Sequence, residues 1–126
     1  MRVLIDTHIF IWCDQKPGSV TPNLLATLRD RQNDIFVSAV TVWEIAIKRA
    51  SGKLAFAAPI AETVERLGFQ LLPISGAHAE RAGGLPRHHN DPFDRLIIAQ
   101  AYLEGLVLGT QDPAMRAYGV AMLGLD

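Results

Sequence analysis

Short apolar runs recur along the chain, and longer segments with apolar residues at helical spacing separate them. The first run is V-L-I at residues 3–5, and it ends at Asp6. Similar runs occupy residues 35–37, 69–74, 106–108 and 120–123. Runs of this length that are rich in valine, isoleucine and leucine are typical of strands buried on both faces. The pattern therefore predicts a central parallel sheet of four to five strands.

The segments between these runs carry the sequence signals of helices. Thr21 is a suitable N-cap residue, and Pro22 stands at the first helical position after it. Further helices are predicted at residues 41–50, 59–67, 77–82, 92–104 and 113–118. Strands that alternate with helices predict a three-layer α/β/α sandwich, formed by a single domain over residues 1–126.

Four acidic residues occupy positions that share one edge of such a sheet. Asp6 comes directly after the first strand, and Asp112 comes shortly after the fourth. Glu44 and Asp94 fall in the first turns of the helices predicted at 41–50 and 92–104. Ligand sites of open parallel sheets lie beyond the carboxyl ends of the strands, where the following helices also begin. We therefore expect all four carboxylates to converge on one rim.

Taken singly, most of these acids also have a structural explanation. Thr41 and Glu44 fit a capping box, and Glu44 and Lys48 fit an exposed i,i+4 ion pair. Asp91 and Asp112 each precede a proline, as N-cap residues do. Capping therefore competes with catalysis as the explanation of these residues.

The capping explanation is weakest for Asp6, whose neighbours Ile5 and Ile9 indicate burial. Four like charges in one crevice also repel each other strongly, so that one of them is expected to be neutral. A hard divalent cation removes this problem, because Mg²⁺ and Mn²⁺ prefer oxygen ligands and keep positions open for water and phosphate. The acids together favour a metal site.

Composition narrows the range of functions. The chain has 126 residues, of which 49% are hydrophobic and 20% charged, with a net charge of −1. It therefore has no general cationic surface for nucleic acid or for anionic membrane, and a polyanion must be bound locally. The single cysteine, Cys13, excludes an internal disulfide and favours a reducing compartment. Asp6 interrupts the N-terminal apolar run, and no window approaches the ~18 apolar residues of a membrane span, so we expect a cytoplasmic protein.

Four segments of the chain resemble PIN-domain ribonucleases, and specifically the VapC toxins of type II toxin–antitoxin systems. They lie in family order across nearly the whole chain. The segments are L-I-D-T-H-I-F-I-W at 4–12, V-S-A-V-T-V-W-E-I-A-I-K at 37–48, H-N-D-P-F-D-R-L-I-I-A-Q-A at 89–101, and T-Q-D-P-A-M-R-A-Y-G-V at 110–120. The second and third segments are the most specific.

The resemblance implies a function and a set of partners. The acidic quartet of the family carries over onto Asp6, Glu44, Asp94 and Asp112, which would bind Mg²⁺ or Mn²⁺ and catalyse the hydrolysis of RNA phosphodiester bonds. Proteins of this family form homodimers and are inhibited by a small VapB-like antitoxin, in complexes that also bind operator DNA. We expect Asp6 to be the central ligand, with Asp94 and Asp112 beside it and Glu44 bound directly or through water.

Other residues near these acids have supporting roles in this interpretation. Thr7, Ser38 and Thr110 are placed to hydrogen-bond the free carboxylate oxygens, although turn or cap hydroxyls explain them equally well. The basic residues that are candidates for RNA contact are Lys48, Arg87, His88 and Arg95. The aromatic residues Trp12, Trp43 and Phe93 are interpreted as core, and residues 54–60 as either an antitoxin groove or internal packing.

Three alternatives remain open from the sequence. One is another metal-dependent phosphohydrolase or a DNA nuclease on a similar sheet; a haloacid-dehalogenase phosphatase would need an aspartate at the position of His8. A phospho-receiver module would need an aspartate at the end of the third strand, where the chain reads P-I-S at 73–75. The third is a catalytically silent PIN domain that acts as a binding module.

Overall fold

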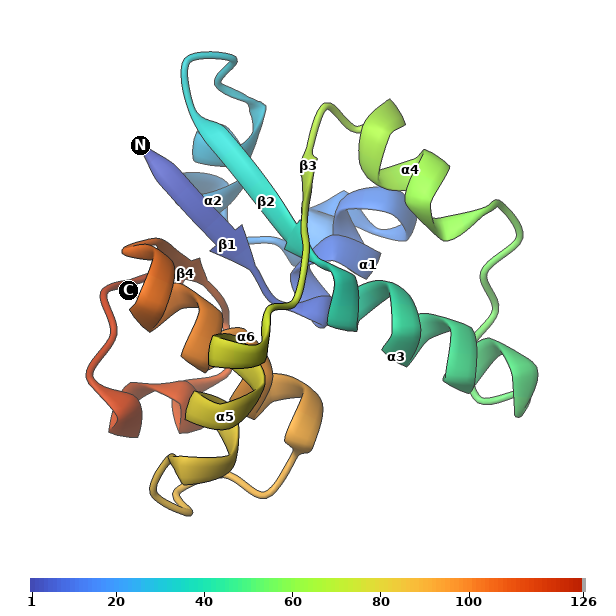
Figure 1. Ribbon diagram of the computed structural model, residues 1–126. Coiled ribbons are helices and arrows are strands. Elements are labelled where there is room, and N and C mark those ends of the chain that lie inside the picture. The colour runs from blue at the N-terminus through green and yellow to red at the C-terminus, as the bar shows by residue number, and fades with distance from the viewer. Residues whose placement is uncertain (126) are drawn as a thin grey trace.

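The computed structural model describes residues 1–125 and contains a five-stranded sheet (Figure 1). The strands are β1 (Arg2–Ile5), β2 (Asp34–Ser38), β3 (Gln70–Leu72), β4 (Val107–Gly109) and β5 (Met122–Leu123). Their order is β3-β2-β1-β4-β5, and all neighbouring pairs are parallel. The predicted parallel sheet is confirmed, and β1, which leads to Asp6, lies at its centre.

Helices cover both faces of the sheet, which makes the fold an α/β/α sandwich (Figure 1). One face carries α1 (Thr7–Gln15), the 3-10 turn η1 (Pro17–Ser19), α2 (Pro22–Arg29) and α4 (Ile60–Arg66). The other carries α5 (Gly76–Gly84), α6 (Pro92–Glu104) and the 3-10 helix η2 (Pro113–Tyr118). The remaining helix, α3 (Ala39–Ala50), runs outward from the end of β2.

Alternate residues of β1 enter the two hydrophobic cores. Val3 and Ile5 pack on the side of α1 and α2, and Leu4 packs on the side of α6 and η2. All three side chains are fully buried. This alternation is the two-residue period of a strand, and it places β1 between the two hydrophobic cores. The backbone that precedes Asp6 is thereby fixed from both faces.

The helix α1 is the main element that the sequence pattern does not predict. Its residues, THIFIWCDQ, are apolar and partly β-branched, and they resemble a continuation of the strand before them. Asp6 ends the strand and caps the helix, because its Oδ1 accepts a hydrogen bond from the N–H of Ile9 at 2.9 Å. The expectation that capping explains Asp6 poorly is therefore wrong, since Asp6 is both buried and a cap.

The start of α3 also differs from the prediction. The N–H of Val40 donates to Oγ of Ser38 at 3.1 Å, so that Ser38 caps the helix and Ala39 begins it. Glu44 consequently lies in the second turn and not in the first. The capping box predicted at Thr41 does not form, because the Thr41 hydroxyl is paired with that of Thr7 at 2.9 Å.

Two predictions about apolar side chains have opposite outcomes. Trp43 is 61% exposed and packs edge-on against Phe93 at 5.5 Å between ring centroids, so its assignment to the core is wrong. Phe56 and Ile60 are buried in the core, which accounts for the apolar stretch 54–60 by internal packing. Within residues 1–125, no helix has both the length and the hydropathy to cross a membrane.

Candidate active site

The acidic site begins with Asp6, at the carboxyl end of the central strand. Its side chain is 2% exposed. Its Oδ1 accepts the N–H of Ile9, and its Oδ2 accepts the hydroxyl of Thr110 at 2.5 Å. Burial raises the pKa of Asp6, while the hydrogen bonds from Thr110 and Ile9 act in the opposite direction. The carboxylate is thus held in one orientation at the floor of the rim.

Thr110 connects Asp6 to the acid that follows β4. Its buried hydroxyl donates to Asp6 and accepts the N–H of Asp112 at 3.0 Å. Asp112 caps η2, because its Oδ1 accepts the N–H of Ala114 at 3.0 Å. One carboxylate oxygen of Asp112 is used for capping, and the other is directed to the site.

Asp94 enters the site from the first turn of α6. Asp91 caps this helix by accepting the N–H groups of Phe93 and Asp94, at 2.9 and 3.4 Å. Burial, together with the charges of Asp91 and Asp6, raises the pKa of Asp94 to about 7. A carboxyl group in this range is partly protonated at neutral pH, where an ordinary surface aspartate is ionised.

His89 lies between two of these acids. Its Nε2 is 2.9 Å from Oδ2 of Asp94 and 3.6 Å from Oδ2 of Asp112. The nearest ligand atoms of the three residues all lie within 4.8 Å of one another. Nε2 is buried and has no hydrogen-bond partner among the described residues. His89 thus faces the same space as the two carboxylates.

Glu44 completes the acidic group from α3. Its side chain is 3% exposed, and its Oε2 pairs with Nζ of Lys48 at 2.6 Å. This hydrogen bond raises the pKa of Lys48, and the charges of Asp91 and Asp94 act in the same direction. The ammonium group is therefore paired with Glu44 and is close enough to Asp91 and Asp94 to interact with their charges.

The other oxygen of Glu44, Oε1, is buried and lacks a hydrogen-bond partner among the described residues. An unpaired buried carboxylate oxygen is costly, because water has been removed from it and nothing has replaced the water. A divalent cation between Glu44, Asp6, Asp94 and Asp112 would supply that partner and offset the mutual repulsion of the acids. The donor set of carboxylate oxygens fits Mg²⁺ or Mn²⁺.

The predicted supporting residues reach the site unequally. Thr110 contacts Asp6, whereas the hydroxyls of Thr7 and Ser38 bond Thr41 and the backbone of α3. Lys48 contacts Glu44. A role for Thr7 or Ser38 beside a metal ligand stays a prediction without a contact to an acid among residues 1–125.

The basic residues of the loop before α6 are placed differently from one another. Arg87 and His88 are exposed, and the His88 ring meets that of Tyr118 edge-on at 5.2 Å. The guanidinium of Arg95 instead donates to four backbone carbonyls, those of Ala82, Leu85, Pro86 and His89. An RNA contact by Arg95 would therefore have to compete with these hydrogen bonds.

His89 is the site residue whose role the sequence pattern does not indicate, and Asp91 has a role beyond the one that the sequence predicts. Asp91 is predicted as a cap, which the structure confirms, but its charge also acts on Asp94 and Lys48. The signal was present in the spacing H-N-D-P-F-D at 89–94. A residue two positions before an N-cap can fold back over the first helical turn, where Asp94 lies.

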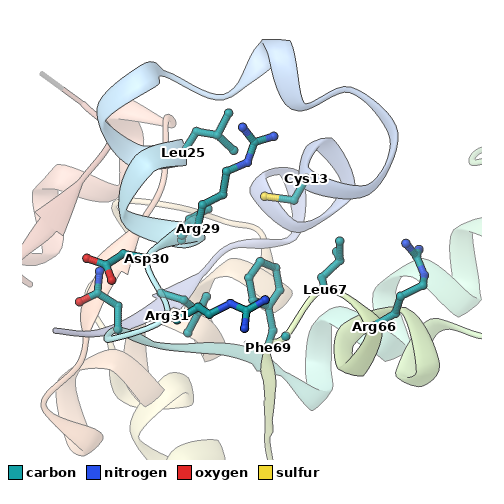
Figure 2. A pocket seen from close by; sticks show the side chains of 12 residues that line it. Cys13, Leu25, Arg29, Asp30, Arg31, Arg66, Leu67 and Phe69 are labelled. Carbon is teal, nitrogen blue, oxygen red and sulfur yellow. The ribbon is translucent and has the colours of Figure 1, made fainter.

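Two cavities lie at opposite edges of the sheet. One of about 270 Å³ adjoins the acids and is lined by Asp6, His8, Ile9, Trp12, Gln111 and Asp112. A larger one of about 500 Å³ lies between the ends of α1, α2 and α4 and has arginines at its mouth (Figure 2). The acids occupy the smaller cavity and the rim around it.

The sequence profile of the PIN domain family matches residues 3–121. The chain belongs to the PIN domain family. Ribonuclease VapC22 of Mycobacterium tuberculosis is 26% identical to it over 119 residues, which cover 92% of this chain and 91% of the relative.

Solved structures show the same PIN fold. VapBC2 from Rickettsia felis, bound to a DNA fragment from its promoter, superposes with a TM-score of 0.73 at 16% identity and covers 100% of both chains. DNA-bound VapBC from Salmonella typhimurium has a TM-score of 0.66 at 20% identity, with 98% of this chain and 97% of that chain covered. A toxin–antitoxin complex from Klebsiella pneumoniae has a TM-score of 0.64 at 23% identity, with 96% and 95% covered.

Proposed function

We propose that this PIN protein is a VapC-like toxin, a metal-dependent endoribonuclease that hydrolyses RNA phosphodiester bonds in the cytoplasm. The observation that carries the proposal is the rim itself. The charges of Asp6 and Glu44 act on Asp94, and the charge of Asp112 acts on Asp6, so the four acids share one edge of the sheet. The buried Oε1 of Glu44 has no partner among the described residues. The similarity to Ribonuclease VapC22 supports RNA as the substrate.

The four carboxylates would bind the cation in different ways. Asp6, Asp94 and Asp112 would hold Mg²⁺ or Mn²⁺ directly, and Glu44 would bind it directly or through water. A bound ion of this kind lowers the pKa of a water ligand and stabilises the charge that develops on the phosphate. Thr110 keeps Asp6 oriented through its 2.5 Å hydrogen bond. The Nζ of Lys48 keeps Oε2 of Glu44 in place at 2.6 Å.

The substrate must be held by local positive charge, because the chain as a whole carries a net charge of −1. Lys48 stands at the rim with its side chain 40% exposed, and it is the basic residue nearest to Glu44. Arg87 and His88 are exposed on the loop that leads into α6. We propose that these residues contact the RNA backbone on either side of the cleaved bond.

Partners follow from the relatives. The structures of VapBC2 from R. felis and VapBC from S. typhimurium contain DNA, and the R. felis fragment is from their promoter. We propose that this chain forms a homodimer and is inhibited by a small VapB-like antitoxin in a similar complex. The exposed side chains of Trp43 (61%) and Ile47 (42%) on α3 leave apolar surface available for another chain.

A nuclease assay on purified protein tests the proposal. Single-stranded and structured RNA should be cut with Mg²⁺ or Mn²⁺, and EDTA should abolish the cleavage. Asp6→Asn should abolish it as well, whereas Asp30→Asn, in the loop before β2, should not. Products should carry 5′-phosphate and 3′-hydroxyl ends. Cleavage that survives both EDTA and Asp6→Asn, or that leaves 2′,3′-cyclic phosphates, would exclude the proposed chemistry, and cleavage of DNA in place of RNA would favour a DNA nuclease.

A further inference from the structure

We infer that His89 is a positioning residue of the acidic site, which orients the carboxylate of Asp94 toward the cation and lies beside that of Asp112. The inference rests on the proposed metal site and adds a residue outside the acidic quartet. Asp94 belongs to α6 and Asp112 to the start of η2, so no backbone hydrogen bond of a single element fixes one relative to the other. The imidazole is the group that meets both, with Nε2 at 2.9 Å from Asp94 and 3.6 Å from Asp112.

The hydrogen bonds of the ring indicate a donor and not a metal ligand. The N–H of Asp91 donates to Nδ1 of His89 at 3.4 Å. Nδ1 therefore carries the lone pair, and Nε2 carries the proton. A protonated Nε2 has no lone pair for a cation. It is buried and forms no hydrogen bond within the described residues, and Oδ2 of Asp94, 2.9 Å away, is the carboxylate oxygen to which it can donate.

The backbone of His89 is held by the same two elements that carry the acids. Its N–H donates to the hydroxyl of Tyr118, in η2, at 2.8 Å, and this hydroxyl donates to the carbonyl of Pro86 at 2.9 Å. From α6, Arg95 donates to the carbonyls of Pro86 and His89, at 3.0 and 3.4 Å. The imidazole is thus positioned before any ligand arrives.

This arrangement has a definite chemical consequence. A carboxylate oxygen that binds a cation keeps a second lone pair, and a donor on that lone pair fixes the direction of the first. Removal of such a donor generally weakens metal binding 10–100-fold. His89 would act on metal affinity through Asp94, whose Oδ2 lies within hydrogen-bond distance of Nε2, without touching the ion.

Titration calorimetry with Mn²⁺ on the purified full chain tests this role. His89→Ala should weaken Mn²⁺ binding by about tenfold. The decisive pair is His89→Gln and His89→Asn, because the amide nitrogen of glutamine reaches the place of Nε2 and that of asparagine reaches only the place of Nδ1. Glutamine should restore the affinity to within about threefold of the unmodified chain, and asparagine should behave like alanine. Asp30→Asn, at the opposite edge of the sheet, should leave Mn²⁺ affinity unchanged.

Each other outcome contradicts a specific statement. If His89→Ala binds Mn²⁺ as the unmodified chain does while Asp94→Asn does not, the positioning role is wrong and the metal site stands. If glutamine fails to restore affinity, His89 acts through packing or as a ligand; a selective loss of Ni²⁺ over Mg²⁺ binding in His89→Gln would identify the ligand, because imidazole favours Ni²⁺. If the unmodified chain binds no Mn²⁺, both the inference and the proposed metal dependence fail.

Discussion

The edge of the sheet where the strands end (the carboxyl edge) carries acids, whereas the edge where they begin (the amino edge) carries arginines. At the carboxyl edge, Asp6 and Glu44 are each 2% exposed and face other acids. At the amino edge, the larger cavity is surrounded by Arg29, Arg31 and Arg66, whose side chains extend around an apolar floor (Figure 2). Its volume is about 500 Å³, against about 270 Å³ for the cavity beside the acids. Size alone would select the amino edge, and not the edge that carries the acids.

The charges of the amino edge have ordinary structural explanations. Arg29 and Arg66 lie in the last turns of α2 and α4, where a cation is favoured by the helix dipole. Arg66 also pairs with Asp14 at 2.7 Å, and its side chain is 60% exposed. At the carboxyl edge the compensation is incomplete within the described residues: Lys48 pairs with Oε2 of Glu44, but Oε1 is buried without a partner, and burial and neighbouring acids raise the pKa of Asp94. Energetic cost, and not volume, distinguishes a candidate site from a surface hollow.

The largest expected difference between the two edges is in catalysis. Asp94→Asn removes a proposed ligand and should lower the rate of RNA cleavage on the order of 100- to 1,000-fold at saturating Mn²⁺. Asp30→Asn, at the amino-edge cavity, is the matched control and should change the rate less than twofold. A cleavage assay with both variants measures the contrast. Equal rates for the two variants would remove the distinction between the edges.

Much of this contrast was predictable from the sequence. Asp6, Asp94 and Asp112 follow strand or proline signals, and the topology of a parallel sheet brings such positions to one edge. The cap at Asp91 is confirmed, and Asp112, for which the sequence leaves capping and catalysis open, also caps its helix. The α6 boundaries, Pro92–Glu104, match the prediction because a proline begins the helix and Gly105, at φ 64°, ends it.

The misses share a physical cause, which is that local patterns do not report tertiary contacts. The apolar run after Asp6 resembles a strand, but the cap at Asp6 and packing in the core with β1 and α2 make it a helix. Trp43 has the composition of a core residue but lies on the outer side of α3. His89 approaches the acids through bonds to Tyr118 and Arg95, which are remote from any motif around it.

The arginines at the two edges should differ in their effect on stability. Arg95→Ala removes four hydrogen bonds to the carbonyls that end α5 and form the loop before α6, and should lower the free energy of unfolding by about 2–3 kcal/mol. Arg31→Ala should lower it by less than about 0.5 kcal/mol, because substitutions of surface residues without such contacts are nearly neutral. Urea unfolding compares the two. A larger loss of unfolding free energy for Arg31→Ala than for Arg95→Ala would mean that Arg31 makes stabilising contacts at the amino edge.

The raised pKa of Asp94 predicts that Asp94→Asn, which should lower the rate of cleavage, also raises the free energy of unfolding of the metal-free protein. Because burial raises this pKa from 3.8 to about 7, the metal-free folded protein binds the proton more tightly than the unfolded chain does. The contribution of Asp94 to folding stability is therefore most favourable below pH 4 and declines as the pH rises through 7. Asp94→Asn should raise the free energy of unfolding by about 1–2 kcal/mol at pH 8, since water at the rim screens part of the repulsion, and by less at pH 5.

Thermal or urea unfolding in EDTA at pH 5 and pH 8 measures this difference. Mn²⁺ should reverse the order at pH 8, because it stabilises the unmodified chain and not the variant. If the variant is less stable than the unmodified chain at pH 8 in EDTA, repulsion between Asp94 and the neighbouring acids does not destabilise the folded protein.

The smallest expected effect is at Cys13, which lies in the amino-edge cavity. Burial raises the pKa of its thiol to about 11, with the nearby Arg29 acting in the opposite direction. At pH 8 the thiolate fraction is therefore only about one in a thousand, which is too small for a nucleophile or a redox sensor. Cys13→Ala should leave RNA cleavage within twofold and lower the free energy of unfolding by no more than about 1 kcal/mol, as expected for a small side chain packed beside α2. Iodoacetamide should label the native protein at pH 8 far more slowly than the urea-unfolded chain. Cys13 and the acids line separate cavities, so labelling of Cys13 should not affect cleavage. Rapid labelling of the native protein that also stopped cleavage would contradict this prediction.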